Sequence, residues 1–113
     1  MVEVINIYNK SELIITVYLD KHNSNASFVT HVKDRYKLPI YLYGLPGIKE
    51  HEPTFEWFEK FIKSRVFPRN RINSNDILVG LNLNKYDIWD IIKATNGYFG
   101  EDNYKLEWVQ TKN

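Results

Sequence analysis

The sequence predicts a small α+β domain, in which an antiparallel sheet from the N-terminal half packs against two or three short helices. Three observations support this fold class. Strand-like apolar patterns dominate residues 2 to 43, helical periodicity dominates residues 54 to 96, and a crossover at residues 44 to 53 contains glycine and proline. With 113 residues, of which 43% are hydrophobic, the chain fits a single domain over residues 1 to 113.

The first half is expected to form three or four antiparallel strands joined by short turns. Residues 2 to 8 alternate, and residues 13 to 19 (LIITVYL) have apolar side chains on both faces, as in a central strand. After a dense turn signal (HNSN), residues 28 to 32 alternate as a half-exposed strand does. Residues 40 to 43 follow Pro39 and are expected to form an edge strand, because proline removes a ladder donor.

The second half is expected to begin with an amphipathic helix. Pro53 suits its first turn, and Phe55 and Phe58 begin an apolar pattern at i, i+3, i+4 and i+7 spacing. Pro68 cannot continue a helix, so the helix is expected to end at about Phe67.

Two shorter helices and a terminal segment are expected to follow. The first helix starts at Ser74, with Asn73 or Ser74 as its cap, and the second follows Asp87 as N-cap. Residues 96 to 97 (NG) are a signal for left-handed helix termination. Residues 104 to 109 (YKLEWV) alternate and are expected to form a final strand or an extended segment on the core.

The residue types present argue against catalysis. The chain has no cysteine, which excludes disulfides, thiolate metal sites and a cysteine nucleophile. Its three histidines, His22, His31 and His51, have no metal-binding spacing, and the carboxylates Asp87 and Asp90 are explained by helix capping. We therefore expect no enzyme activity, no metal site and no cofactor. Without a signal or membrane-spanning pattern, the expected location is the cytoplasm.

The basic segment at residues 60 to 71 (KFIKSRVFPRNR) is the most informative stretch. It carries five positive charges and no negative one, although the net charge of the chain is only +1. Part of this charge is expected to pair with Glu56 and Glu59, one or two helical turns away. Arg65 and Pro68 are expected to form a structural corner at the helix end. The residues expected to contact a partner are Lys60, Lys63, Arg69, Arg71, Trp57 and Trp108.

From about Thr54 onward the chain resembles a small module that is common in Firmicutes and their mobile elements, alone or in front of HipA-like serine/threonine kinase domains. The matching residues are Arg65, Phe67, Pro68, Arg71, Leu81-Asn82-Leu83, Tyr86, Asp87, Thr95-Asn96-Gly97, Asp102 and Tyr104. A tryptophan that usually follows the aromatic residue is absent, and Trp108 is its candidate substitute. The resemblance covers about half of the chain and implies no kinase activity. It implies an accessory protein of a mobile element or a toxin–antitoxin system.

These observations lead to one expected function and one alternative. The expected function is a non-enzymatic protein-binding accessory factor of a mobile element or prophage, such as an anti-CRISPR-like inhibitor of a host defence complex or a toxin–antitoxin component. A high aromatic content and a positive segment ahead of a more acidic C-terminal third favour a protein partner. The alternative is a nucleic-acid-binding module that uses the basic corner at residues 60 to 71. Neither hypothesis involves a membrane.

Overall fold

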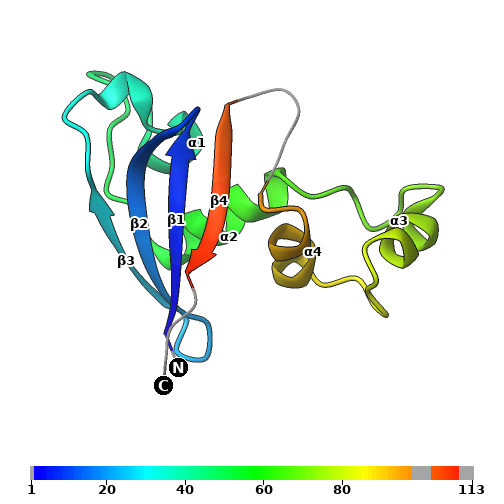
Figure 1. The fold of residues 1–113 in the computed structure, drawn as a ribbon. Helices are drawn as coiled ribbons and strands as arrows, with labels where there is room; N and C mark the ends of the chain where they lie inside the picture. The colour runs from blue at the N-terminus through cyan, green and yellow to red at the C-terminus, as the bar shows by residue number, and fades with distance from the viewer. Residues whose placement is uncertain (1, 98–102, 110–113) are drawn as a thin grey trace.

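A computed structural model describes residues 2–97 and 103–109 and confirms the α+β class (Figure 1). The strands are β1 (Glu3–Asn9), β2 (Glu12–Asp20), β3 (Asn25–Thr30) and β4 (Tyr104–Val109). The helices are the 3-10 helix η1 (Arg35–Lys37), α1 (Ile40–Tyr43), α2 (Phe55–Ser64), α3 (Ser74–Gly80) and α4 (Ile88–Ala94).

The four strands form one antiparallel sheet in the order β3-β2-β1-β4. The first three strands are neighbours in sequence and join by short turns, whereas β4 returns from the far end of the chain and pairs with β1, with Val4 opposite Val109. Of the two alternatives predicted for residues 104 to 109, a final strand or an extended segment, the structure confirms the strand. The pairing of β1 with β2 shifts register between Ile7 and Tyr8, which is the signature of a bulge.

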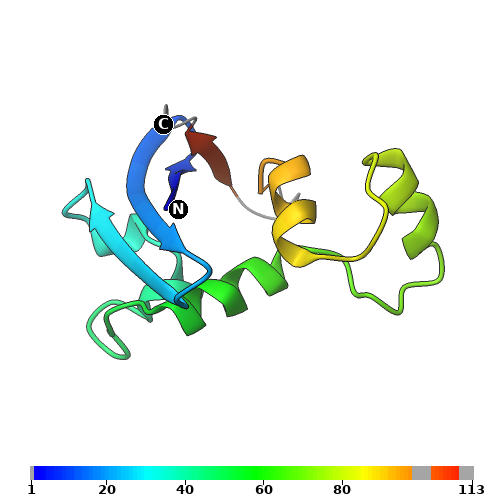
Figure 2. The same cartoon turned by 90° about the horizontal axis from the view of Figure 1, so that it is seen from below.

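The core lies between one face of this sheet and the helices that cross it (Figure 2). On α2, Phe58 is fully buried, and its ring meets the ring of Phe28 from β3 edge to face, at a centroid distance of 5.8 Å. Such pairs add to the free energy gained by burial of the rings. The fully buried aliphatic side chains are Ile5, Ile7, Ile14, Ile15, Val17, Leu19, Leu42, Ile62, Ile91, Ile92 and Leu106.

Residues 40 to 43 form the short helix α1, so the prediction of an edge strand there is wrong. Pro39 has an extended backbone and takes the N-cap position, where its missing N–H costs nothing. Its carbonyl oxygen accepts hydrogen bonds from the N–H groups of Leu42 and Tyr43, at 3.1 and 2.9 Å. A single helical turn buries these two adjacent side chains together, whereas a strand would point them to opposite faces.

The expected helix in the middle of the chain begins later and ends earlier than the sequence indicates. Thr54 is the N-cap of α2, and its hydroxyl oxygen accepts from the N–H of Trp57, so Pro53 lies just before the helix. The helix ends at Ser64 and not at about Phe67. The reason is tertiary, because Arg65 leaves the helix to reach backbone carbonyl groups in the C-terminal part of the chain.

The C-terminal helices begin where the sequence predicts. Asn73 is the N-cap position of α3 but makes no side-chain capping bond there, so α3 starts at Ser74 without this support. The carboxylate of Asp87 accepts from the N–H groups of Trp89 and Asp90 and caps α4. After α4 the chain passes through Asn96 and Gly97, both with positive φ, as predicted for helix termination.

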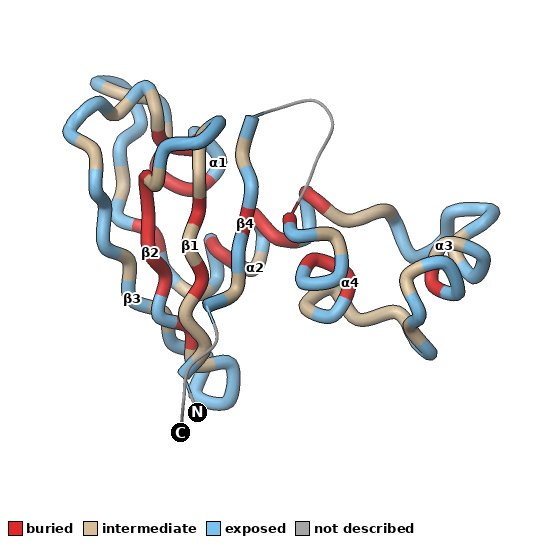
Figure 3. The backbone as a smooth tube through the Cα atoms, viewed as in Figure 1, coloured by how far each residue is buried: buried red, intermediate tan, exposed pale blue. Residues whose placement is uncertain are grey.

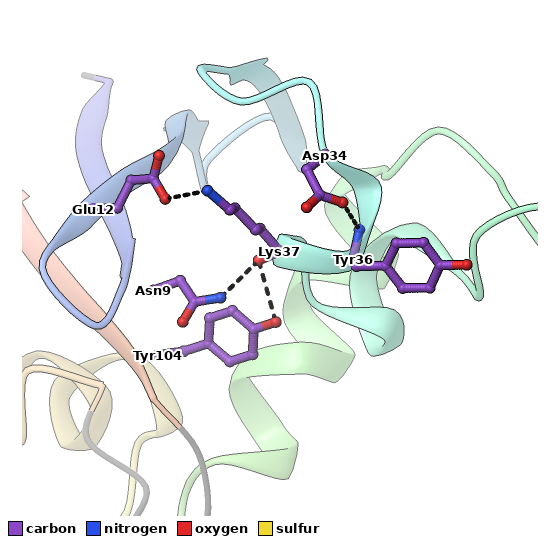
Figure 4. A network of polar contacts seen from close by, with 6 residues as sticks. All are labelled: Asn9, Glu12, Asp34, Tyr36, Lys37 and Tyr104. Atoms are coloured by element: carbon purple, nitrogen blue, oxygen red, sulfur yellow. Dashed lines mark hydrogen bonds and ion pairs between the residues drawn. The ribbon is translucent and has the colours of Figure 1, made fainter.

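The helix η1 attaches to the sheet through one shared carbonyl group (Figure 4). The oxygen of Lys37 accepts from the side-chain amide of Asn9 in β1 at 3.1 Å and from the hydroxyl of Tyr104 in β4 at 3.4 Å. The ammonium group of Lys37 also contacts Glu12 of β2 at 2.9 Å, and this bond raises the pKa of Lys37 above its usual value. Three strands are thus linked to one residue of η1.

The helix α3 lies apart from the sheet, at the end of an arm formed by residues 67 to 86 (Figures 1 and 3). The base of this arm is closed by Tyr86, whose hydroxyl donates to the carbonyl oxygen of Phe67 at 2.6 Å. The two rings also meet edge to face at 5.5 Å. Within α3 only Leu78 is buried, and Val79 is 76% exposed. The arm therefore has little apolar packing of its own.

We expect Gly97→Ala to lower the free energy of unfolding by about 2–5 kcal/mol, measured by chemical denaturation. The backbone of Gly97 has φ +65, and a Cβ there would lie 2.6 Å from the Cβ of Leu106 in the core. The control is Gly80→Ala in α3, where a Cβ meets no atom within 4 Å. This control should be neutral or slightly stabilising, and equal effects of the two changes would contradict the packing argument.

Candidate functional site

The structure separates the five cations of residues 60 to 71 into exposed and buried groups. Lys60 and Lys63 are exposed on α2, and Arg69 and Arg71 are exposed in the segment that follows it, as is Pro68. Arg65 alone is buried, with 6% of its surface exposed. The basic segment is thus not one continuous row of accessible charges.

Arg65 binds the backbone of two distant segments. Its Nε and Nη2 atoms both donate to the carbonyl oxygen of Gly97, at 2.9 and 2.7 Å, and Nη2 also donates to that of Tyr104, at 3.0 Å. Its guanidinium group lies over the ring of Phe61, 5.3 Å from the centroid. A planar guanidinium has several donors in a fixed geometry, which suits it to this bridging of carbonyl groups. Arg65 therefore connects the end of α2 to the turn after α4 and to β4.

The other cations make weaker local contacts. The ammonium group of Lys60 lies 4.9 Å from the ring centroid of Trp57, and the guanidinium of Arg69 lies 5.9 Å from that of Tyr86. Burial raises the pKa of Tyr86, and the nearby charge of Arg69 opposes this shift. The Nε atom of Arg71 donates to the side chain of Asn73 at 3.1 Å.

The expected pairing of α2 carboxylates with α2 lysines is not found. In the part of the chain that the structure describes, neither Glu56 nor Glu59 forms an ion pair with Lys60 or Lys63. Lys60 packs over Trp57 instead, because a long side chain can cover an aromatic face while its charge stays in water. Lys60 and Lys63 are therefore not held in ion pairs within the helix.

The two tryptophans expected to contact a partner lie on different elements. Trp57 projects from α2 and is 37% exposed. Its ring stacks on His51 at 4.6 Å and meets Tyr41 of α1 edge to face at 6.4 Å. Trp108, on β4, is half-buried and packs against the core. The structure therefore places the exposed ring of Tyr41 and the half-buried ring of His51 around Trp57, and gives Trp108 a largely internal role.

Two shallow apolar hollows lie side by side along α1 and α2. One, of about 340 Å³, is lined by Ile40, Tyr41, Gly44, Leu45, Lys49, His51 and Trp57. The other, of about 360 Å³, is lined by Pro39, Ile40, Tyr41, Phe61, Ser64, Arg65 and Tyr104. Both share Ile40 and Tyr41, so they form one surface depression, which we call the α1–α2 groove. The residues of the basic segment that line it are Phe61, Ser64 and Arg65; Trp108 lies outside it.

The groove exists because α1 is amphipathic over a single turn. Leu42 and Tyr43 enter the core, which leaves Ile40 and Tyr41 outside, with Ile40 60% exposed. Gly44 then reverses the chain with φ +84, and a Cβ at this position would lie 1.5 Å from the carbonyl oxygen of Lys49. The returning loop brings His51 back to α1, where its N–H donates to the oxygen of Tyr43 at 3.0 Å.

A threonine–histidine contact on the sheet was not foreseen from the sequence. The Oγ1 atom of Thr16 lies 2.7 Å from Nε2 of His31 and donates its hydrogen to Oδ1 of Asn6 at 2.9 Å. Because a hydroxyl has one hydrogen, His31 must donate to Thr16 and does not accept its proton. This is the reverse of a base-activated nucleophile, so the contact joins strands and does not support catalysis.

Metal binding and membrane insertion find no support in the described residues. No group of three or more His, Asp or Glu side chains among residues 2–97 and 103–109 is placed to hold a metal ion. None of the helices in these residues has both the length and the apolar character that a bilayer span requires.

Comparisons with protein-family models, with curated proteins and with solved structures find no match to this chain.

We expect Arg65→Ala to lower the free energy of unfolding by about 3–5 kcal/mol, because it leaves the buried oxygens of Gly97 and Tyr104 with fewer donors. Lys63→Ala, two residues earlier, is the matched control and should change stability by no more than about 0.5 kcal/mol. Urea denaturation of both variants measures the difference. An Arg65 variant as stable as the control would show that these bonds contribute little.

Tyr43 should make the fold sensitive to alkaline pH. Burial raises the pKa of Tyr43 from 10.0 to about 12, and the nearby Glu52 acts in the same direction, against Arg35. The folded state therefore holds this proton more tightly than the unfolded state. The contribution of the protonated Tyr43 to the free energy of unfolding is fully present below pH 10. As the pH rises from 10 to about 12, this contribution is lost, and the free energy of unfolding falls by roughly 2–3 kcal/mol.

Tyr43→Phe should remove this alkaline loss, measured by thermal melts across the pH range. At neutral pH the variant should be as stable as the wild type, or more stable by up to about 1 kcal/mol, since the buried Tyr43 hydroxyl has no hydrogen-bond partner among residues 2–97 and 103–109. Tyr36→Phe, at an exposed tyrosine, is the control and should retain the wild-type slope. An unchanged slope in Tyr43→Phe would assign the alkaline sensitivity to another group.

Proposed function

We propose that this chain is a non-enzymatic protein-binding module and that its partner inserts apolar side chains into the α1–α2 groove. The observation on which the proposal depends is the joining of two apolar hollows through the exposed side chains of Ile40 and Tyr41. Monomeric proteins seldom leave such concave apolar surfaces uncovered unless they bind something.

The composition of the groove suits a protein partner. Trp57, Tyr41 and His51 form a cluster of rings, and rigid aromatic side chains are frequent anchors of binding energy in protein interfaces. Ile40 supplies a branched aliphatic surface beside them. Covering these side chains removes apolar surface from water and gains about 25 cal/mol per Å² buried. Lys49 lies at the wall of the hollow and Lys60 on the ring of Trp57, where they favour a partner with acidic groups beside its apolar anchors.

The alternative of nucleic-acid binding is less well supported. It would depend on Lys60, Lys63, Arg69 and Arg71, since Arg65 is bound to backbone carbonyl groups. Nucleic-acid surfaces usually combine clustered cations with stacking aromatic residues. Here the exposed ring cluster at Trp57 lies in an apolar groove, and the net charge of the whole chain is only +1.

The proposed biological setting follows from the sequence resemblance alone. We place the protein among accessory factors of mobile elements or prophages, as an inhibitor of a host defence complex or as a component of a toxin–antitoxin system. In either setting the protein would act by occupying a surface of its partner. A groove that binds without chemistry is sufficient for that role.

The groove is tested by comparing Ile40→Asp with Val79→Asp in affinity purification from cells that naturally express the protein. Both residues are exposed apolar side chains, at 60% and 76%, but Val79 lies on α3, away from the groove. Ile40→Asp should weaken capture of the main partner at least tenfold, which corresponds to about 1.4 kcal/mol or more. Val79→Asp should capture as much as the wild type.

Nuclease treatment and salt distinguish the two kinds of partner. Capture of a protein partner should survive nuclease and should persist in the combined Lys63→Ala, Arg69→Ala and Arg71→Ala variant. Nucleic-acid binding would instead give a log–log salt slope of roughly −2 to −3 and would be lost in that combined variant. Capture that is indifferent to Ile40→Asp but abolished by the cation changes would refute the groove as the binding site.

A further inference from the structure

Strand β3 forms one edge of the sheet (Figures 1 and 2). Three of its residues direct their backbone N–H and carbonyl groups away from the sheet. The N–H of His31 donates to the oxygen of Ile14 at 2.8 Å, which fixes the alternation of hydrogen bonds between β2 and β3. By this alternation the backbone groups of Ala26, Phe28 and Thr30 point outward, away from β2. The sheet thus ends in a row of outward donors and acceptors.

These outward groups have no partner in the described part of the chain. Neither the N–H nor the carbonyl group of Ala26, Phe28 or Thr30 makes a hydrogen bond there. The opposite edge differs, because on β4 the N–H of Leu106 donates to the oxygen of Asn96 at 2.9 Å and the oxygen of Tyr104 accepts from Arg65. Among the described residues, the edge at β4 is therefore partly bonded to other segments, and the edge at β3 is unpaired.

The edge formed by β3 also lacks the features that usually prevent pairing. Natural edge strands are commonly protected by charged residues, proline or bulges. The strand Asn25–Thr30 has the sequence NASFVT, and residues 23 to 32 contain no Asp, Glu, Lys, Arg or Pro. A polar hollow of about 380 Å³ lies beside its first half, between Ala26 and Phe55. The strand itself therefore presents no charge to another strand, and the carboxylate that lines this hollow, Glu56, belongs to α2.

We propose that β3 pairs with β3 of a second copy of this chain, antiparallel across a two-fold axis at Phe28. Phe28 then lies opposite Phe28 of the second copy, and Ala26 lies opposite Thr30 of the second copy. Each of these residues exchanges both of its outward backbone hydrogen bonds with its opposite. The two sheets become one continuous sheet, and the contact closes on itself as a two-fold dimer and does not propagate into a fibre.

The side chains of β3 favour a second copy over other extended segments. Val29 is 46% exposed on the uncovered face of the sheet, and in this register it lies opposite the small Ser27 and diagonal to Val29 of the second copy. Diagonal neighbours across strands are close enough for branched side chains to contact each other. A net charge of +1 gives little repulsion between copies. This pairing does not involve the α1–α2 groove.

The dimer should be weak, because a single pair of edge strands buries an area at or below the low end of stable interfaces. We expect a dissociation constant in the range of about 10 to 500 µM. Sedimentation equilibrium from about 1 µM to about 1 mM covers this range. A wild-type protein that is still monomeric at the highest concentration would overturn the proposal.

Three substitutions test the position of the interface. Ala26→Pro removes an outward N–H and leaves the β2–β3 ladder intact, and Val29→Lys places like charges diagonally across the axis. Each should raise the dissociation constant at least tenfold. The control is Val109→Lys, at a valine 39% exposed at the other end of the sheet, which should dimerise as the wild type does. If the Ala26→Pro variant fails to fold, the dissociation constant of the Val29→Lys variant alone tests the position of the interface.

Amide exchange measured by NMR gives a direct readout. The N–H groups of Ala26, Phe28 and Thr30 should gain protection as protein concentration rises, whereas those of Ser27 and Val29 should be protected at every concentration, since they already pair with β2. Self-association that persists in both β3 variants, or that is lost in Ile40→Asp, would move the interface elsewhere. Protection of the same three amides by a different protein, with no dimer, would assign the edge to that protein and refute self-pairing.

Discussion

The guanidinium group of Arg65 donates to the carbonyl oxygens of Gly97 and Tyr104, and these bonds join the end of α2 to the turn after α4 and to β4, beside the apolar core that packs the helices on the sheet. A buried guanidinium is stable only when its donors find acceptors, so its burial requires the turn after α4 and the start of β4 to be in place. The close approach of Gly97 to Leu106 depends on the same arrangement. Arg65 thus fixes the end of α4, while the burial of Ile92 and the contact of Trp89 with Phe58 place the rest of that helix on the core.

The same residue links the internal structure to the surface. Arg65 forms part of the wall of the α1–α2 groove, while Ile40 and Tyr41 form the part that is open to solvent. In the basic segment, Arg65 is thus buried, and the other four cations are exposed on the surface.

Local signals account for what could be predicted from the sequence. The cap at Asp87 and the apolar run in β2 depend on neighbouring residues, so a single sequence reveals them. The helix at residues 40 to 43 could not be predicted in this way, because the loop that returns to it at His51 is a tertiary contact. The groove joins residues of two helices, and the open edge of β3 is defined by hydrogen-bond register. Neither the groove nor the open edge can be predicted from the local sequence of the residues that form it, because each depends on contacts between distant segments.

The pairing of β4 with β1 has a consequence for how the chain folds. β1, β2 and β3 are joined by short turns and can associate soon after synthesis, whereas β4 reaches β1 only across almost the whole described chain. Closing so long a loop costs entropy before any contact offsets it, so we expect the β1–β4 ladder to form late. On the ribosome, the nascent chain would therefore expose the unpaired side of β1 until β4 emerges, and binding of a chaperone at that stage would act on a three-stranded intermediate.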